Sequence, residues 1–222
     1  MIFGPERRRT RRLLAACLMA APSAVPPQTG APPWGLAPLM LSLSQVRSAS
    51  ATFTERRTSP LLNEPLTAQG TLTYRAPDYM RKTTLSPMPQ DFILDHDRVT
   101  MSGGTDGETR EFSLADAPQL GGFVEGIRAT LAGDLPALER LYEVELSGEA
   151  QGWQLVLRPI DPTLARFVRT IAIQGSQDRI AAVYTLSSDQ GDSCMNVSEI
   201  VNAPVPAPSA ARDPALQPDR HR

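Results

Sequence analysis

Residues Leu66 to Arg75 carry the clearest alternation of apolar and polar side chains in the sequence. Such a two-residue period predicts a strand with one buried face. Pro65 precedes the run and Ala76-Pro77-Asp78 follows it, and both stretches are typical of strand ends. A second extended run, Tyr79 to Leu85, comes next, so the two are expected to pair as antiparallel neighbours. The expected buried face carries Leu66, Ala68, Gly70, Leu72 and Tyr74.

Similar short runs, separated by turn residues, recur along most of the chain. They predict about ten or eleven strands, enough for an antiparallel sheet to curl strongly. Further strands are expected over residues 51–58, 91–95, 98–102 and 109–114, and in segments with the apolar positions Tyr142, Val144 and Leu146; Trp153, Leu155 and Leu157; Phe167, Ile171 and Ile173; Ile180, Ala182, Tyr184 and Leu186; and Met195 and Val197.

Helical spacing of apolar residues appears in two places. The first begins at Leu36 and predicts a helix of about four turns that leads into Phe53. The second interrupts the strands between Pro118 and Leu141, where Asp134 is expected to cap a second short helix. The expected fold is therefore α+β: a large curled antiparallel sheet, or half-open β-barrel, closed by helical lid segments.

The two ends of the chain differ from its middle. Five arginines and one glutamate in the first twelve residues precede an apolar stretch and small residues, a pattern that predicts an export signal over residues 1–24. A proline-rich spacer is expected over 25–35, a single folded domain over 36–203 and a disordered Pro/Ala-rich tail over 204–222. These features predict a soluble periplasmic protein. Of the two cysteines in the sequence, one lies in the predicted signal. After its removal Cys194 would have no partner for an internal disulfide.

The residue types found in catalytic and metal sites are sparse. The chain has two histidines, and His96 lies between Asp95 and Asp97 in an expected turn. We therefore predict no catalytic residues, no metal site and no cofactor; a secreted hydrolase using His96 is the enzyme alternative. The net charge of −2, with its basic excess confined to the leader, does not favour a nucleic-acid partner.

The pattern alone leaves the role of the helices open. They either complete a permanently packed core or form a movable cover over a cavity for an apolar ligand.

Several segments also occur in the same order as in a known protein family. They are the export signal, the helix leading from Leu39 to Phe53, Phe53-Thr54-Glu55, residues 69–74, the corner Arg75-Ala76-Pro77, residues 131–134, residues 153–159 and Gly191-Asp192. Together they resemble a divergent branch of the periplasmic outer-membrane lipoprotein carrier family, the LolA-like proteins. The resemblance implies a monomeric lipid-binding chaperone that shields the acyl chains of a lipoprotein or other lipid between the inner and outer membranes.

The resemblance also implies partners and site residues. An inner-membrane donor and an outer-membrane acceptor are expected, and Arg75 stands where the family commonly has an arginine that ties the lid to the barrel. A sensory module of the same fold, which detects lipid or lipoprotein and regulates a membrane partner, is the alternative. The expected lipid cavity is lined by Leu72, Tyr74, Phe92, Leu94, Phe112, Phe123, Ile127, Trp153, Leu155 and Ile171.

Overall fold

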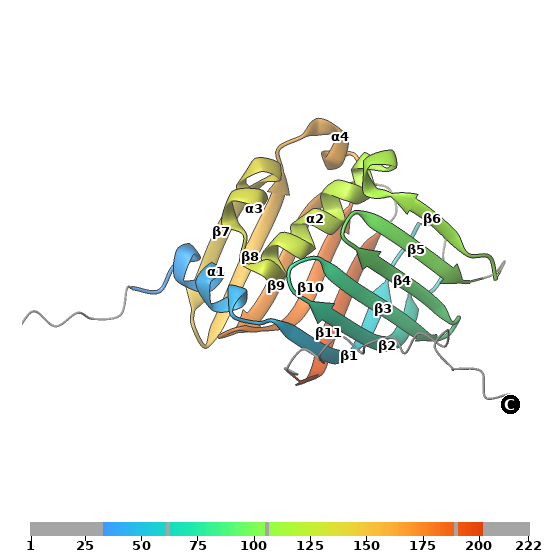
Figure 1. Cartoon of the computed structure of the whole chain (residues 1–222), viewed down its shortest axis with the longest axis horizontal. Coiled ribbons are helices and arrows are strands. Elements are labelled where there is room, and N and C mark those ends of the chain that lie inside the picture. The colour runs from blue at the N-terminus through green and yellow to red at the C-terminus, as the bar shows by residue number, and fades with distance from the viewer. Residues whose placement is uncertain (1–32, 61–62, 105–106, 189–190, 202–222) are drawn as a thin grey trace, which may run out of the picture. The chain divides into compact units, whose positions relative to one another are not determined.

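A computed structural model describes residues 33–60, 63–104, 107–188 and 191–201 (Figure 1). The predicted export signal, most of the spacer and the predicted tail lie outside these residues. Within them, no helix is long and apolar enough to cross a membrane.

Eleven strands form one sheet in which every neighbouring pair is antiparallel. Its spatial order is β6-β5-β4-β3-β2-β1-β11-β10-β9-β8-β7, so one meander runs outward to β6 and a second returns from β7 to pair β11 with β1. The strands are β1 (Ser48–Arg57), β2 (Leu66–Arg75), β3 (Tyr79–Ser86), β4 (Gln90–Asp95), β5 (Arg98–Gly103), β6 (Arg110–Ser113), β7 (Tyr142–Glu149), β8 (Gly152–Pro159), β9 (Val168–Ser176), β10 (Arg179–Ser187) and β11 (Asp192–Val201).

The helices stand at three points of the described chain. Two of them, α2 and α3, connect β6 to β7 at the opposite edge of the sheet, which explains why helices interrupt the strands midway. Figure 1 shows α1, α2 and α3 on the same side of the curled sheet. The expected fold class is thus confirmed: an unclosed antiparallel sheet with helices against it. The helices are α1 (Leu36–Ser44), the 3-10 turn η1 (Leu114–Asp116), α2 (Pro118–Ala132), α3 (Leu135–Leu141) and α4 (Pro162–Ala165).

The first helix is shorter than its spacing predicted. It ends at Ser44, and the chain is already a strand from Ser48, where a helix of about four turns was expected to lead into a strand beginning at residue 51. Every residue from Ser48 to Arg57 has a partner on β2. The full ladder with a neighbouring strand outweighs the weak helix propensity of this serine- and threonine-rich segment.

One face assignment on β10 was wrong. The alternation of Ile180, Ala182, Tyr184 and Leu186 indicated a common buried face, but the pairing with β9 shifts between Ile180 and Ala182. A one-residue irregularity moves the following side chains to the opposite face of a strand. As a result Val183 packs against the core, whereas Tyr184 and Leu186 are exposed.

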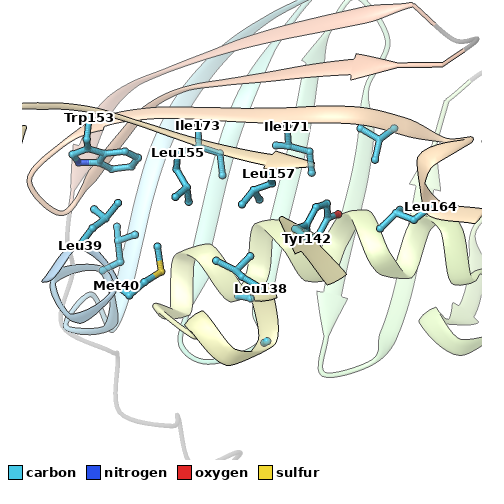
Figure 2. Packing of buried hydrophobic residues seen from close by; sticks show 14 residues of the cluster. Leu39, Met40, Leu138, Tyr142, Trp153, Leu155, Leu157, Leu164, Ile171 and Ile173 are labelled. Atoms are coloured by element: carbon cyan, nitrogen blue, oxygen red, sulfur yellow. The ribbon is translucent and has the colours of Figure 1, made fainter. Parts of the chain in front are cut away.

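The main hydrophobic core joins α1 and α3 to β7, β8 and β9 (Figure 2). In that view Leu39 and Met40 of α1 and Leu138 of α3 face the side chains of Leu155 and Leu157. All five side chains are almost fully buried. This half of the molecule is a closely packed layer of helix on sheet.

Candidate functional site

The concave face of strands β2 to β6 carries two adjacent rows of side chains. The first row crosses the strands through Tyr74, Met80, Leu94, Val99 and Phe112, each opposite the next. The second row crosses through Leu72, Lys82, Phe92 and Met101. Directly opposite side chains on one face lie about 5 Å apart, so both rows are continuous surfaces. They are apolar except at Lys82.

Helix α2 covers this surface and links it to the main core. Its Val124 is buried against Leu94 and Val99, and Leu120 packs beside them. Phe123 packs against both this smaller cluster and the main core. Its ring meets Phe167 edge to face, with centroids 6.4 Å apart and an interplanar angle of 72°. Movement of α2 would therefore uncover the rows on β2 to β6.

Two glycines let α2 approach its neighbours closely. A Cβ atom at Gly126 would lie 2.8 Å from the ring of Tyr142, and one at Gly122 would lie 2.8 Å from Leu164. The hydroxyl of Tyr142 also donates a 2.8 Å hydrogen bond to the carbonyl of Gly122. One side of α2 is thus held by close packing and by a hydrogen bond.

Eight of the ten expected cavity residues belong to the two clusters, and the other two lie outside them on the concave face. Trp153, Leu155 and Ile171 are core side chains with at most 2% exposure, and Ile127 packs against them. The smaller cluster contains Leu94, Phe92 and Phe112, and Phe123 belongs to both clusters. Leu72 and Tyr74 lie on the same concave face in the two rows.

The two clusters differ in how completely they are covered. The main core holds fourteen buried side chains, whereas the smaller cluster holds three and is otherwise made of partly buried ones. Leu72, Phe92, Phe112 and Phe123 all keep intermediate exposure. Apolar groups that retain contact with water are the ones that can gain most from a further apolar partner. We therefore place the candidate site on β2 to β5 beneath α2.

A charged cluster lies on the same concave face. Glu55 of β1 is 3% exposed, and its carboxylate accepts hydrogen bonds from Arg57 Nε at 2.8 Å, from Ser193 Oγ at 2.6 Å and from Lys82 Nζ. The Lys82 ammonium also lies 4.8 Å from the centroid of the Phe53 ring, a cation–π contact. Gly70, opposite Phe53, leaves the room that this ring occupies.

Burial and charge act in opposite directions on this cluster. Burial alone would raise the pKa of Glu55, but Lys82, Arg57 and Ser193 together lower it to about 2. Burial lowers the pKa of Lys82, and Glu55 only partly offsets that effect. The carboxylate is therefore stabilised as an anion at the expense of the lysine, so the pair contributes less than the Glu55 shift alone would give.

Tyr74 marks the other end of the second strand. Its hydroxyl is buried and has no hydrogen-bond partner among the described residues. Burial raises the pKa of the Tyr74 hydroxyl, against the opposing charges of Arg47 and Arg128. Arg128 belongs to α2 and is paired with Glu125 of the same helix, at 2.6 Å. A polar edge thus surrounds the buried hydroxyl where α2 passes the end of β2.

Arg75, the expected lid latch, is exposed on the opposite face of β2 from Tyr74. Its guanidinium stacks on the ring of Tyr79, 3.9 Å from the ring centroid. The two residues flank the Ala76-Pro77 corner. The stacking joins the two sides of that corner, and the latch role of Arg75 stays a prediction.

Two surface hollows lie away from the candidate site. One, of about 390 Å³, is on the outer face of the sheet and is lined by Tyr184, Leu186 and Cys194 among others. The other, of about 520 Å³, lies beside α1 at Pro38 and Leu41. Neither lies between α2 and the concave face. Val124 and Phe123 of α2 pack on the smaller cluster, so a ligand inserted between them and the sheet would displace α2.

The structure places His96 in the exposed turn between β4 and β5. Its ring lies 2.9 Å from the carboxylate of Asp95 and 3.6 Å from that of Asp78. The hydrogen bond to Asp95 raises the pKa of the imidazole, with Asp78 adding to the effect. No group of three or more potential metal ligands occurs within the described ranges of the chain.

Sequence reasoning missed the pairing of Glu55 with Lys82. The two residues lie 27 positions apart and meet across β2. A signal was present, because Glu55 follows Phe53 at the two-residue spacing of a buried face. The chain also contains a single lysine, at this position.

The sequence was compared with profiles of known protein families and matches one over most of its length. A sequence profile described as “Outer membrane lipoprotein carrier protein LolA-like” matches residues 36–205. No curated protein matches the chain in sequence.

Solved structures with similar folds share little sequence with the chain. The LolA superfamily protein NE2245 from Nitrosomonas europaea is 9% identical, with a TM-score of 0.43 over 76% of this chain and 93% of that one. A putative outer membrane lipoprotein-sorting protein domain from Vibrio parahaemolyticus is 10% identical, with a TM-score of 0.42 and coverage of 75% and 90%. MucB, in the Pseudomonas aeruginosa MucA/MucB complex, is 15% identical, with a TM-score of 0.42; the match covers 78% of this chain and 59% of that one.

Proposed function

This chain belongs to the family of LolA-like outer membrane lipoprotein carrier proteins, and we propose that it shields acyl chains of a lipoprotein or another lipid during transfer between the inner and outer membranes. The proposal places the protein in the periplasm after removal of its leader. An inner-membrane donor and an outer-membrane acceptor would be its partners. The function requires binding and release and no covalent chemistry.

The observation that carries the proposal is the incompletely covered apolar surface beneath α2. Leu72 and Phe92 remain half-buried on the concave face, next to the fully buried Leu94. Phe123 of α2 is half-buried in the same small cluster as Phe92 and Leu94. An acyl chain inserted here would replace contacts that α2 makes with the sheet by contacts of the same apolar kind.

The energetics favour exchange over tight storage. Each methylene removed from water contributes about 0.8 kcal/mol, whether the chain enters a protein or a membrane. The protein must offset most of the membrane's advantage and still release its cargo. Opening α2 costs the contacts of Val124 and Phe123 with the sheet, so part of the binding free energy is spent on opening. This cost keeps affinity low enough for transfer.

The three expected cavity residues on β8 and β9 have a different role from those on β2 to β6. Trp153, Leu155 and Ile171 are covered by α1 and α3 in the main core. They form the fixed wall of the domain and would meet a ligand only if those helices also moved.

The proposal is tested by native mass spectrometry of the protein purified without detergent from the periplasm of its source. We expect the mass of one chain plus an acyl-bearing molecule. A bare polypeptide that also takes up no fluorescent acyl chain from vesicles would contradict lipid binding.

A transfer assay then separates the carrier from the sensory alternative. A carrier increases the movement of an acylated cargo from donor to acceptor vesicles in proportion to its concentration. Lipid-dependent association with a membrane protein, without any transfer, would replace the carrier by the sensory module.

A further inference from the structure

Lys82 occupies an unusual position for the only lysine of the chain. Its side chain is 23% exposed and stands in the middle of an apolar row. Leu72 lies opposite it on β2 and Phe92 opposite it on β4. Both neighbours belong to the surface on which we place the acyl chain. An ammonium therefore lies directly beside that surface.

The cluster around Lys82 contains two cations and one carboxylate. Glu55 is paired with both Lys82 and Arg57, and Ser193 supplies a further hydrogen bond. Within the described residues, neither cation is paired with a second carboxylate. The three groups together carry a net charge of +1, and the Lys82 side chain among them is only 23% exposed, so electrostatic interactions there are stronger than in bulk water.

The cluster is buried at one end and exposed at the other. Glu55 is buried and fixes both cations, while the Arg57 side chain is 55% exposed. Arg57 and Ser193 are opposite residues on β1 and β11, two positions along β1 from Glu55. Donors held in place by a buried carboxylate are preorganised for an anion, because little conformational freedom remains to be lost. An anion would enter past Arg57 and reach Lys82.

We propose that Lys82 and Arg57, held by Glu55, bind the anionic group of an acylated ligand whose chain lies over Leu72 and Phe92. This inference rests on the proposed function and narrows its ligand class to amphiphiles with a carboxylate or phosphate near the acyl chain. The chain lies in the apolar rows beneath α2, and the head group lies at the exposed end of β1.

The test compares four ligands on the full-length protein by isothermal titration calorimetry. Oleate and lysophosphatidate carry an anion next to an acyl chain, monooleoylglycerol is a neutral analogue, and inorganic phosphate is the anion alone. Arg57→Gln and Lys82→Gln each remove one cation from the cluster. Arg98→Gln is the matched control, because Arg98 is exposed and its nearest partner, Glu111, is 3.8 Å away.

We expect the two anionic amphiphiles to bind at least tenfold more tightly than monooleoylglycerol. Arg57→Gln should remove most of that difference and leave the affinity for monooleoylglycerol within twofold. Arg98→Gln should change none of the affinities. Arg57→Lys, which keeps the charge, should restore the preference. If Lys82→Gln fails to fold because Glu55 loses a partner, the Arg57 variants decide the matter.

Equal binding of oleate, lysophosphatidate and monooleoylglycerol would overturn the inference while leaving lipid binding intact. Binding of inorganic phosphate in competition with none of the acylated ligands would also overturn it, since the anion site would then be separate from the acyl site. Failure of all three acylated ligands to bind would contradict the proposed function itself.

Discussion

The hydroxyl of Tyr142 donates a hydrogen bond to the carbonyl of Gly122, at 2.8 Å, and so ties β7 to α2. The tyrosine ring fills the space beside Gly126, one turn further along the helix. This contact lies on the side of α2 next to the packed core, while the other side covers the half-buried rows of β2 to β5. Tyr142 thus holds one side of α2 in place, and the helix would open on its other side, over β2 to β5.

A side chain at Gly126 is expected to push α2 away from Tyr142. The Cβ atom of a Gly126→Ala variant would lie 2.8 Å from the ring, closer than packed atoms tolerate. Overpacking of this kind costs about 1–3 kcal/mol of unfolding free energy, measurable by urea denaturation. Gly152→Ala is the control, because nothing lies within 4 Å of a Cβ atom there. Equal stabilities of the two variants would show that α2 is not closely held.

The two buried tyrosines should respond differently to loss of their hydroxyls. Tyr74→Phe removes a hydroxyl without a partner among the described residues, so stability should stay unchanged or rise by up to about 1 kcal/mol. Tyr142→Phe removes a formed hydrogen bond and should lower stability by about 1 kcal/mol. Chemical denaturation of both variants measures the contrast. A loss at Tyr74 as large as that at Tyr142 would reveal an additional partner of the Tyr74 hydroxyl.

Acid should weaken the fold through Glu55. The pKa of Glu55 is about 2 in the folded protein against 4.5 in the unfolded chain, so the unfolded chain binds the proton more readily. The resulting stability is fully present above pH 4.5 and is lost as the pH falls towards 2, by at most about 3 kcal/mol. Urea unfolding of the wild type and of Glu55→Gln across this window measures it. Glu55→Gln should show the shallower dependence, and parallel curves would contradict the assignment.

A carboxylate on the concave face should block an acyl chain. Leu72→Glu introduces a charge directly opposite Lys82, where the two can pair and the fold can survive. The variant loses apolar surface and also neutralises the lysine, so binding of a fluorescent acyl probe should fall by at least tenfold. Leu85→Glu is the matched control, because Leu85 is 61% exposed on β3. Unchanged binding by a folded Leu72→Glu variant would remove this face from the site.

Local patterns predicted the elements that depend on neighbouring residues. The strand from Leu66 to Arg75 has the bounds that its alternation indicated, and Asp134 caps α3 by accepting a 3.0 Å hydrogen bond from the Ala137 amide. The short helix α4 was missed because the sequence around Pro162 resembles an ordinary connection. Asp161 caps it through the amides of Thr163 and Leu164, at 2.7 and 2.9 Å.

Features that depend on strand register were less predictable. The β10 irregularity at Ile180 reversed the faces of Tyr184 and Leu186, and no residue pattern marks it. The apolar rows through Phe92 and Phe112 were foreseeable from alternation, since each strand shows its own buried face. The pairing of Glu55 with Lys82 was not, because it requires the order and register of three strands.

A lipid site beneath α2 is tested most directly by locating where an acyl chain contacts the protein. A fatty acid carrying a photoreactive diazirine near its terminal methyl group can be cross-linked to the full-length chain, and the labelled peptides identified by mass spectrometry. We predict labelling of β2, β4 and the α2 face bearing Phe123 and Val124. Labelling confined to the outer hollow at Tyr184, Leu186 and Cys194, or to the surface of α1 at Leu41, would contradict a lipid site beneath α2.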